Sequence, residues 1–203
     1  MAIINLKKKE VECKIVYYGP GRSGKTTNLE YIFKHSKKMM TDEMVSVQTT
    51  GDVTLFFDFA PMGIGKIKGC EVRIQLYTVP GQVKYNSTRK LVLKGADGVV
   101  FVADSLKVRH EKNIGSLKNL SLNLKEYGIN ILNFPVVLQY NKRDLANDGL
   151  PMMAVKEMDD YYNRQLKAPA YAASAITGEG VNDTLKALLV LTLRSLKQEA
   201  GWS

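Results

Sequence analysis

The 203-residue chain is 45% hydrophobic and 24% charged, and its formal net charge is +9 at pH 7. This length and apolar content suffice for the core of one domain, and no apolar run approaches the roughly 18 to 20 residues that a membrane-spanning helix needs. The sequence has no secretory signal pattern or lipidation motif, and its two cysteines are too few for a disulfide framework. We therefore expect a soluble, cytoplasmic protein without a stable membrane anchor.

The positive charge is spread along the chain. Lysines gather in residues 7–9, 34–38, 84–94 and 107–118, not in one block. Dispersed lysines are typical of solvated faces, so we expect no nucleic-acid partner and a chain that is monomeric when alone. An acidic partner protein, a transient membrane contact and a polymer surface are alternatives that the charge leaves open.

Short apolar segments rich in β-branched residues alternate with longer amphipathic segments. This alternation is typical of a mostly parallel sheet with helices on both faces. The predicted strands are residues 13–18, 55–59, 72–77, 99–103, 136–140 and 170–173. The predicted helices are residues 25–35, 86–93, 109–127, 153–163 and 181–198.

Two segments lack a clear period. Residues 36–54 are polar and rich in methionine and threonine, which favours a functional loop. Residues 61–69 are rich in glycine and predict a hairpin turn between two antiparallel strands. We therefore predict an α/β fold whose six-stranded, mostly parallel sheet has one antiparallel edge strand. Residues 1–203 form a single domain in this prediction, with residues 1–10 as a candidate N-terminal extension.

A phosphate-binding loop is the strongest local signal. The pattern Gly19-x-x-x-x-Gly24-Lys25-Thr26 follows a predicted strand and opens a predicted helix, as in P-loop proteins. Its backbone N–H groups and the helix dipole favour an anion, Lys25 can reach the β- and γ-phosphates, and the Thr26 hydroxyl can bind Mg²⁺. An ordinary glycine turn is the less favoured interpretation. The predicted phosphate-binding residues are Gly19, Gly21, Arg22, Ser23, Gly24, Lys25, Thr26 and Thr27.

A second motif selects the base. Asn141-Lys142-Arg143-Asp144 ends the predicted strand 136–140, where a parallel strand meets a crevice at its carboxyl edge. The Asp144 carboxylate can accept from guanine N1–H and from the exocyclic amine, whereas adenine presents an acceptor at N1. Alone this pattern is often a strand-end turn, but downstream of a P-loop it predicts guanine binding by Asn141, Lys142 and Asp144.

Two further segments complete the predicted site. Ser174, Ala175 and Ile176 precede the last helix, and their backbone can donate to the guanine carbonyl, although a capped helix entry explains them as well. Pro80, Gly81 and Gln82 follow the strand 72–77. Here the Gly81 N–H can sense a γ-phosphate and Gln82 can orient the attacking water as the catalytic residue. A Pro-Gly turn without chemistry is the alternative.

In this order, the four motifs resemble the Ras-like small GTPases over essentially the whole chain. Three longer phrases are similar to the bacterial MglA family of gliding-motility proteins. They are YGPGRSGKTTNL at residues 18–29, TLFFDF at residues 54–59 and YTVPGQ at residues 77–82.

The resemblance implies a Ras-like G domain that uses Mg²⁺, hydrolyses GTP to GDP and controls polarity and gliding or pilus motility in a bacterium. It also implies polar recruitment in the GTP state. The implied partners are a Roadblock-type activating protein similar to MglB, an exchange factor, and motility or polarity effectors.

The resemblance also assigns residues near the metal, with two departures. Thr54 would sense the γ-phosphate through Mg²⁺. Thr78 replaces the aspartate of the Ras class, as in MglA-like proteins, and we expect Asp58 to supply the missing metal contact. Val53 stands where that family has an arginine. An arginine finger is worth roughly 10³- to 10⁵-fold in rate, so hydrolysis is expected to be slow. Arg22 is a nearby replacement, although a solvent-facing position is favoured for it.

Three functions are therefore weighed. The leading one is a hydrolytic switch in which residues 39–54 and 80–90 reorganise between the GTP and GDP states. A GTP-binding scaffold with little or no hydrolysis is the alternative that Val53 favours. A P-loop phosphotransferase is the third, but the sequence has no evident acceptor-binding lid.

Overall fold

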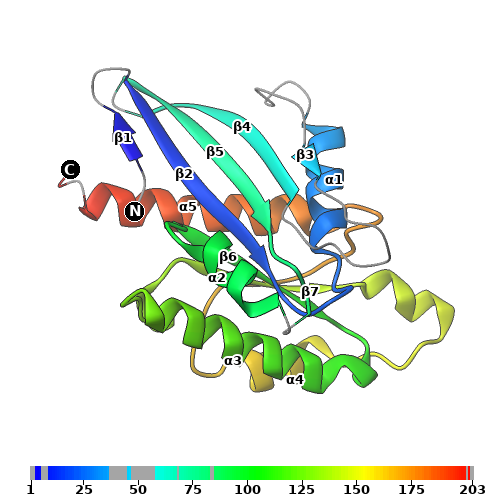
Figure 1. Cartoon of the computed structure of the whole chain (residues 1–203). Coiled ribbons are helices and arrows are strands. Elements are labelled where there is room, and N and C mark those ends of the chain that lie inside the picture. Colours follow the sequence, from blue (N-terminus) through cyan, green and yellow to red (C-terminus); the bar gives the residue numbers. More distant parts are fainter. Residues whose placement is uncertain are drawn as a thin grey trace.

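The computed structural model describes residues 3–5, 9–36, 45–46, 58–67, 69–82, 85–199 and 201. A twisted sheet runs through the molecule, with helices packed on both of its faces (Figure 1). Among the described residues, no helix combines the length and apolarity that crossing a bilayer requires.

The centre of the sheet is parallel. β2 lies between β5 and β6, and β7 and β8 continue the sheet beyond β6. In spatial order these strands are β5 (Cys70–Thr78), β2 (Glu10–Tyr18), β6 (Gly98–Asp104), β7 (Val136–Asn141) and β8 (Ala170–Ala172). Every residue of β6 and β7 is buried, which agrees with the apolar runs at residues 98–103 and 136–138 in these central strands.

Antiparallel strands border this centre, and here two predictions are wrong. β4 (Asp58–Ile67) pairs antiparallel with β5 as expected, but it continues through the predicted turn at residues 61–69 because Gly63 and Gly65 lie at a β-bulge. Two short strands, β1 (Ile3–Asn5) and β3 (Val45–Ser46), pair antiparallel with β2 and β4. The described residues thus contain eight strands, not six, and three antiparallel pairings, not one.

The helices form two layers. One layer is α1 (Lys25–His35) with α5 (Val181–Glu199), and the other is α2 (Asn86–Leu93), α3 (His110–Glu126) and α4 (Val155–Tyr162). In the described connections lie the 3-10 helices η3 (Lys107–Arg109), η4 (Ile131–Asn133) and η5 (Arg143–Asp148). The five helices therefore match their predicted positions to within two residues.

Alternate side chains of β2 enter the two cores. Ile15 and Tyr17 pack with α1 and α5, whereas Val16 and Tyr18 pack with α2, α3 and α4. All five parallel strands end at the same edge of the sheet, so the loops that follow them meet there. This edge carries the predicted site.

Candidate nucleotide-binding site

A cavity of about 1060 Å³ opens at the carboxyl edge of the parallel strands. The P-loop, the segment after β5, the start of α3 and the loops after β7 and β8 all contribute to its wall. The four motifs, which are far apart in the sequence, are thus brought to one cavity. Its predicted site residues are Gly21, Arg22, Gly24, Lys25, Thr26, Thr27, Gly81, Gln82, Asn141, Lys142, Asp144, Ala175 and Ile176.

The P-loop wraps around the start of α1. Gly24 is the N-cap of the helix with a φ of 96°, and a Cβ there would collide with the side-chain amide of Asn141. Glycine is therefore required both for the backbone conformation and for the close approach. The first turn of α1 has no acidic residue, so the positive end of the helix faces the cavity without a competing carboxylate.

Lys25 is only 6% exposed, although it is charged. Its Nζ donates to the Pro20 carbonyl at 2.8 Å and to the Gly19 carbonyl at 3.3 Å. The ammonium group is thus held inside the curve of the P-loop. Thr26 and Thr27 are half-buried in the cavity wall at the start of α1.

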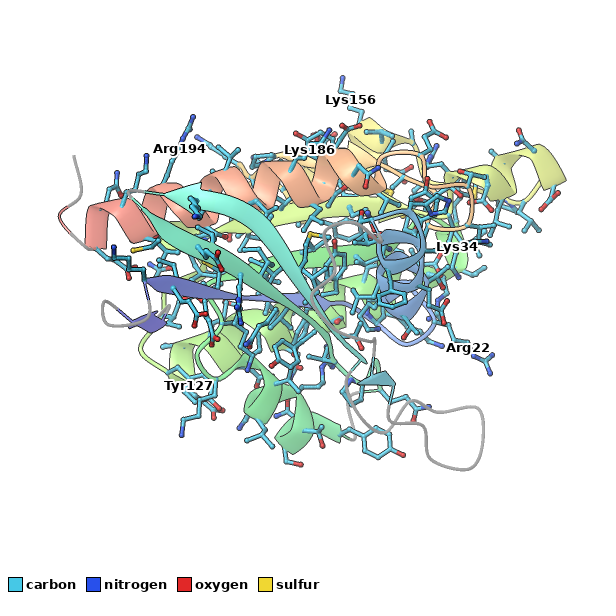
Figure 2. The ribbon with its side chains drawn as sticks, turned by 90° about the horizontal axis from the view of Figure 1, so that it is seen from above. Arg22, Lys34, Tyr127, Lys156, Lys186 and Arg194 are labelled. Atoms are coloured by element: carbon cyan, nitrogen blue, oxygen red, sulfur yellow. The ribbon has the colours of Figure 1, made fainter. Side chains whose placement is uncertain are left out.

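The two side chains between Gly21 and Gly24 point in opposite directions. Ser23 is fully buried, and its Oγ has no hydrogen-bond partner in the described part of the chain. Arg22 has a φ of 62° and an exposed side chain that extends away from the ribbon (Figure 2). This orientation agrees with the solvent-facing position favoured for Arg22 from the sequence.

Asn141 joins two loops at the end of the cavity that Asp144 lines. Its Nδ2 donates to the Ser23 carbonyl at 2.7 Å, and its Oδ1 accepts from the Ala175 N–H at 2.8 Å. One fully buried side chain therefore connects β7, the P-loop and the loop before α5. Both functions of the amide are used for this connection, so Asn141 acts as a brace between loops.

Asp144 follows at the start of η5. Its Oδ1 is buried and has no hydrogen-bond partner among the residues described. A buried carboxylate oxygen without a donor is costly, and guanine supplies two N–H donors on one edge. The residues present therefore fit a guanine base.

The loop before α5 forms the rim of this end. Ser174 is fully buried and its Oγ accepts from the Thr177 N–H at 3.3 Å, so its side chain closes a turn ahead of α5. Ile176 is 74% exposed at the edge of the cavity. An apolar side chain at this position can cover one face of a base.

The segment after β5 touches the P-loop directly. A Cβ at Gly81 would collide with the backbone of Gly21, and the Cγ of Gln82 lies 3.8 Å from the place of a Cβ at Gly21. Gln82 is exposed and lines the cavity. The predicted catalytic glutamine therefore lies beside the P-loop at Gly21.

α2, which follows this segment, is anchored by a buried arginine. Arg89 is fully buried, donates to Ser116 Oγ at 2.8 Å, and lies 4.2 Å above the ring of Tyr18. Burial raises the pKa of Tyr18 to about 12, although Arg89 opposes this shift. The phenol is therefore neutral at physiological pH and serves as a hydrogen-bonding group, donating to Asn119 at 2.6 Å.

The metal predictions are only partly covered by the structure. Thr54 and Val53 lie outside the described residues, and Asp58 is described only as the first residue of β4, paired with Ser46. Where the chain is described, no group of three or more His, Cys, Asp or Glu side chains could hold a metal. The half-buried Thr26 hydroxyl fits a Mg²⁺ ion whose other ligands are phosphate oxygens and water.

The comparisons with known proteins agree with this geometry. The profile of the Arf, or ADP-ribosylation factor, family matches residues 1–191. The chain belongs to this family of small GTPases. It is 51% identical over 198 residues to the mutual gliding-motility protein MglA of Myxococcus xanthus, covering 98% of this chain and 99% of that protein. It is also 30% identical over 108 residues to the Ras-related protein Rab-32A of Dictyostelium discoideum, covering 53% and 49%. This small GTPase is thus MglA-like.

Two sets of residues around the site are not predicted by the sequence. Asp104, at the end of β6, is fully buried and accepts from Lys142 Nζ at 2.8 Å, with Arg109 Nε 3.4 Å away. Its position at a strand end is the only signal that could have identified it. Beneath the P-loop, Asn28 and Gln139 form a reciprocal amide pair, and Gln139 also donates to Thr184.

Proposed function

We propose that this protein is a molecular switch that binds GTP, hydrolyses it to GDP, and controls polarity and motility in a bacterium. The observation that carries the proposal is that one cavity is lined both by a carboxylate suited to a guanine base and by a P-loop lysine suited to phosphates. At one end, the buried Oδ1 of Asp144 has no donor in the described part of the chain, and at the other Lys25 lies inside the P-loop. A guanine base and a polyphosphate chain meet the needs of these two ends together. The printed name of the Myxococcus xanthus relative supports the link to gliding motility.

The residues of the cavity have separate roles in this proposal. Lys25 and the N–H groups at the start of α1 bind the phosphates, and Thr26 would hold Mg²⁺, which neutralises phosphate charge when bound. Gln82 orients a water molecule. The oxygen of this water bonds to the γ-phosphorus as the bond from that phosphorus to the β–γ bridging oxygen breaks. The electron pair of that bond stays on GDP, and the proton of the water goes to the released phosphate.

The remaining parts of the proposal come from the family. Residues 39–54 and 80–90 would change between the two nucleotide states, with Thr54 as the contact to the metal and Asp58 as a further ligand. The buried Arg89 supports a pivot within the second segment, because it fixes α2 to α3. A Roadblock-type activating protein, an exchange factor and motility effectors would act on a cytoplasmic protein that is recruited to a cell pole.

Single-turnover hydrolysis of bound GTP tests the switch. We expect Gln82→Leu to lower the rate by about 10²-fold, the order of a positioned proton-transfer group, while GDP affinity stays the same. Gln198→Leu, at an exposed position on α5, is the matched control and should hydrolyse GTP at the parent rate. Equal rates for the parent and Gln82→Leu would show that Gln82 has no catalytic role.

The same experiment separates the alternative function. A GTP-binding scaffold is favoured by one observation, valine at position 53, where the resemblance implies an arginine. If the parent protein binds GTP and leaves it intact over many hours, the scaffold replaces the hydrolytic switch.

A further inference from the structure

The proposed reaction needs a cation at the phosphate end of the cavity. Charge develops on the bridging and γ-phosphate oxygens during the transfer, and an arginine in the same chain or from a partner can stabilise it. Position 53 carries valine, so this chain must supply the cation from elsewhere if it acts alone. Arg22 extends into solvent, and Lys142 Nζ is held by the buried Asp104 at 2.8 Å.

Arg109 is the arginine that reaches the P-loop from another element. It is the last residue of η3 and lies directly before α3. Its Nη2 donates to the Gly21 carbonyl, across 88 positions in the sequence. Its side chain is 17% exposed and lines the same cavity. The guanidinium group is thus held beside the phosphate-binding loop and is largely removed from solvent.

The contact identifies which end of the cavity Arg109 serves. Gly21 is the P-loop residue against which Gly81 packs, and the Cγ of Gln82 lies beside it. Arg109 and Gln82, the predicted water-orienting residue, therefore both lie beside Gly21 of the P-loop.

The orientation of the guanidinium is set by a buried acid. Asp104 is fully buried, and its Oδ2 is 3.4 Å from Arg109 Nε and 2.8 Å from Lys142 Nζ. A guanidinium has five N–H donors in a rigid plane; the hydrogen bond to Gly21 uses one of them, and Nε faces Asp104 as an ion pair. The plane is fixed, and donors remain for phosphate oxygens. Asp104 is therefore a positioning residue that links this cation to the guanine-binding motif through Lys142.

We propose that Arg109 is a catalytic residue that supplies, from within the same chain, the cation that stabilises the phosphates during GTP hydrolysis. The proposal rests on the hydrolytic function proposed above. Arg109 gives and takes no proton. Its N–H groups neutralise the charge that grows on the bridging oxygen as the bond to the γ-phosphorus breaks, and this oxygen leaves as part of GDP. The residue thus takes the place of the arginine that position 53 lacks.

Substitution of Arg109 tests the proposal in single turnover with Mg²⁺ and GTP. We expect Arg109→Ala to lower the hydrolysis rate by about 10³-fold, the lower bound for an arginine finger, with GDP affinity within about threefold of the parent. Guanidinium chloride should restore part of the rate, and sodium chloride at equal concentration should not. Lys118→Ala removes a charge from an exposed position of α3 outside the cavity and should leave the rate unchanged.

A second measurement does not depend on turnover. GDP with fluoroaluminate imitates the phosphoryl group in transfer, and such mimics report stabilisation of the transition state. Calorimetry should find that Arg109→Ala and Arg109→Lys both bind fluoroaluminate on GDP at least about tenfold more weakly, since lysine lacks the planar fork. Because Arg109→Lys keeps the charge, it also serves if the alanine variant does not fold.

The outcomes are distinct. If the parent hydrolyses GTP and Arg109→Ala does so equally fast, the role of Arg109 is wrong and the switch stands. If hydrolysis, GDP affinity and fluoroaluminate affinity all fall by the same factor, Arg109 only holds the P-loop and the proposal is overturned. If the parent itself does not hydrolyse GTP, both the switch and the role of Arg109 fail.

Discussion

The two ends of the cavity are built in different ways. At the proposed guanine end, Asn141 binds to the P-loop and to the Ala175 N–H, and the buried Oδ1 of Asp144 has no partner among the described residues. At the phosphate end, the described contacts of Lys25 Nζ go to the carbonyls of Gly19 and Pro20 in its own loop. The first end is preorganised for a ligand, whereas the second exchanges internal contacts for phosphate oxygens when a nucleotide binds.

This difference separates selectivity for the base from affinity for the phosphates. A preorganised carboxylate rejects a base that cannot donate to it, since its buried oxygen then stays unpaired. A lysine that changes partners contributes affinity for any polyphosphate, because it acts as a point charge. Base selectivity and phosphate affinity should therefore respond to different substitutions.

The largest expected effect is at the guanine end. Asp144→Asn should lower GDP affinity by about 10⁴-fold, because the amide turns a donor toward the donors of guanine. ADP affinity should change little, so the preference for guanine should collapse. Calorimetry with both nucleotides measures this, with Asp148→Asn at the exposed end of η5 as the control. Retained selectivity would mean that another group reads the base.

A smaller effect is expected at the phosphate end. Lys25→Ala should lower GDP and ADP affinity by the same factor, roughly 10- to 150-fold, since a charged hydrogen bond contributes about 1.5–3 kcal/mol. The ratio of the two affinities should not change. Lys34→Ala removes an exposed charge at the other end of α1 (Figure 2) and should bind as the parent does. A change in the ratio of GDP to ADP affinity would show that Lys25 also contributes to selectivity for the base.

The smallest effect is expected for the buried hydrogen bonds of Gln139 beneath the P-loop. Gln139→Leu removes the donor to the buried Oδ1 of Asn28 and to Thr184 Oγ1 and should lower the free energy of unfolding by about 1–3 kcal/mol, although Asn28 Nδ2 and Thr184 Oγ1 keep their bonds to Gly24 and Gly180. GDP affinity should stay within about threefold. Urea unfolding compares this variant with Gln165→Leu at an exposed position. Unchanged stability would show that water satisfies the groups as well as Gln139 does.

The motifs carry most of what the sequence can predict. Glycines at fixed positions in the P-loop and the run from Asn141 to Asp144 specify local chemistry, and the structure brings them together at one cavity. The burial period predicts the central strands and the helices equally well, because both depend on local alternation. β1 and β3 were missed, since strands of two or three residues show no period.

The parts that were missed depend on contacts between distant residues. Asp104 and Arg109 belong to no motif, and their relation to Gly21 exists only after β2 and β6 lie side by side. The same holds for the amide pair of Asn28 and Gln139, 111 positions apart. Gly65 appeared to mark a turn because a bulge and a turn use glycine for the same backbone freedom.

The place of β1 has a practical consequence for imaging. β1 pairs with residues 10–12 at the amino end of β2, whereas the P-loop follows the opposite end of this nine-residue strand, roughly 30 Å away. Figure 1 draws β1 and the carboxyl end of α5 on that remote side. A fluorescent domain attached beyond β1 or beyond α5 would therefore start from the side of the sheet opposite the cavity, so the location of the protein in living cells can be followed with the cavity left open.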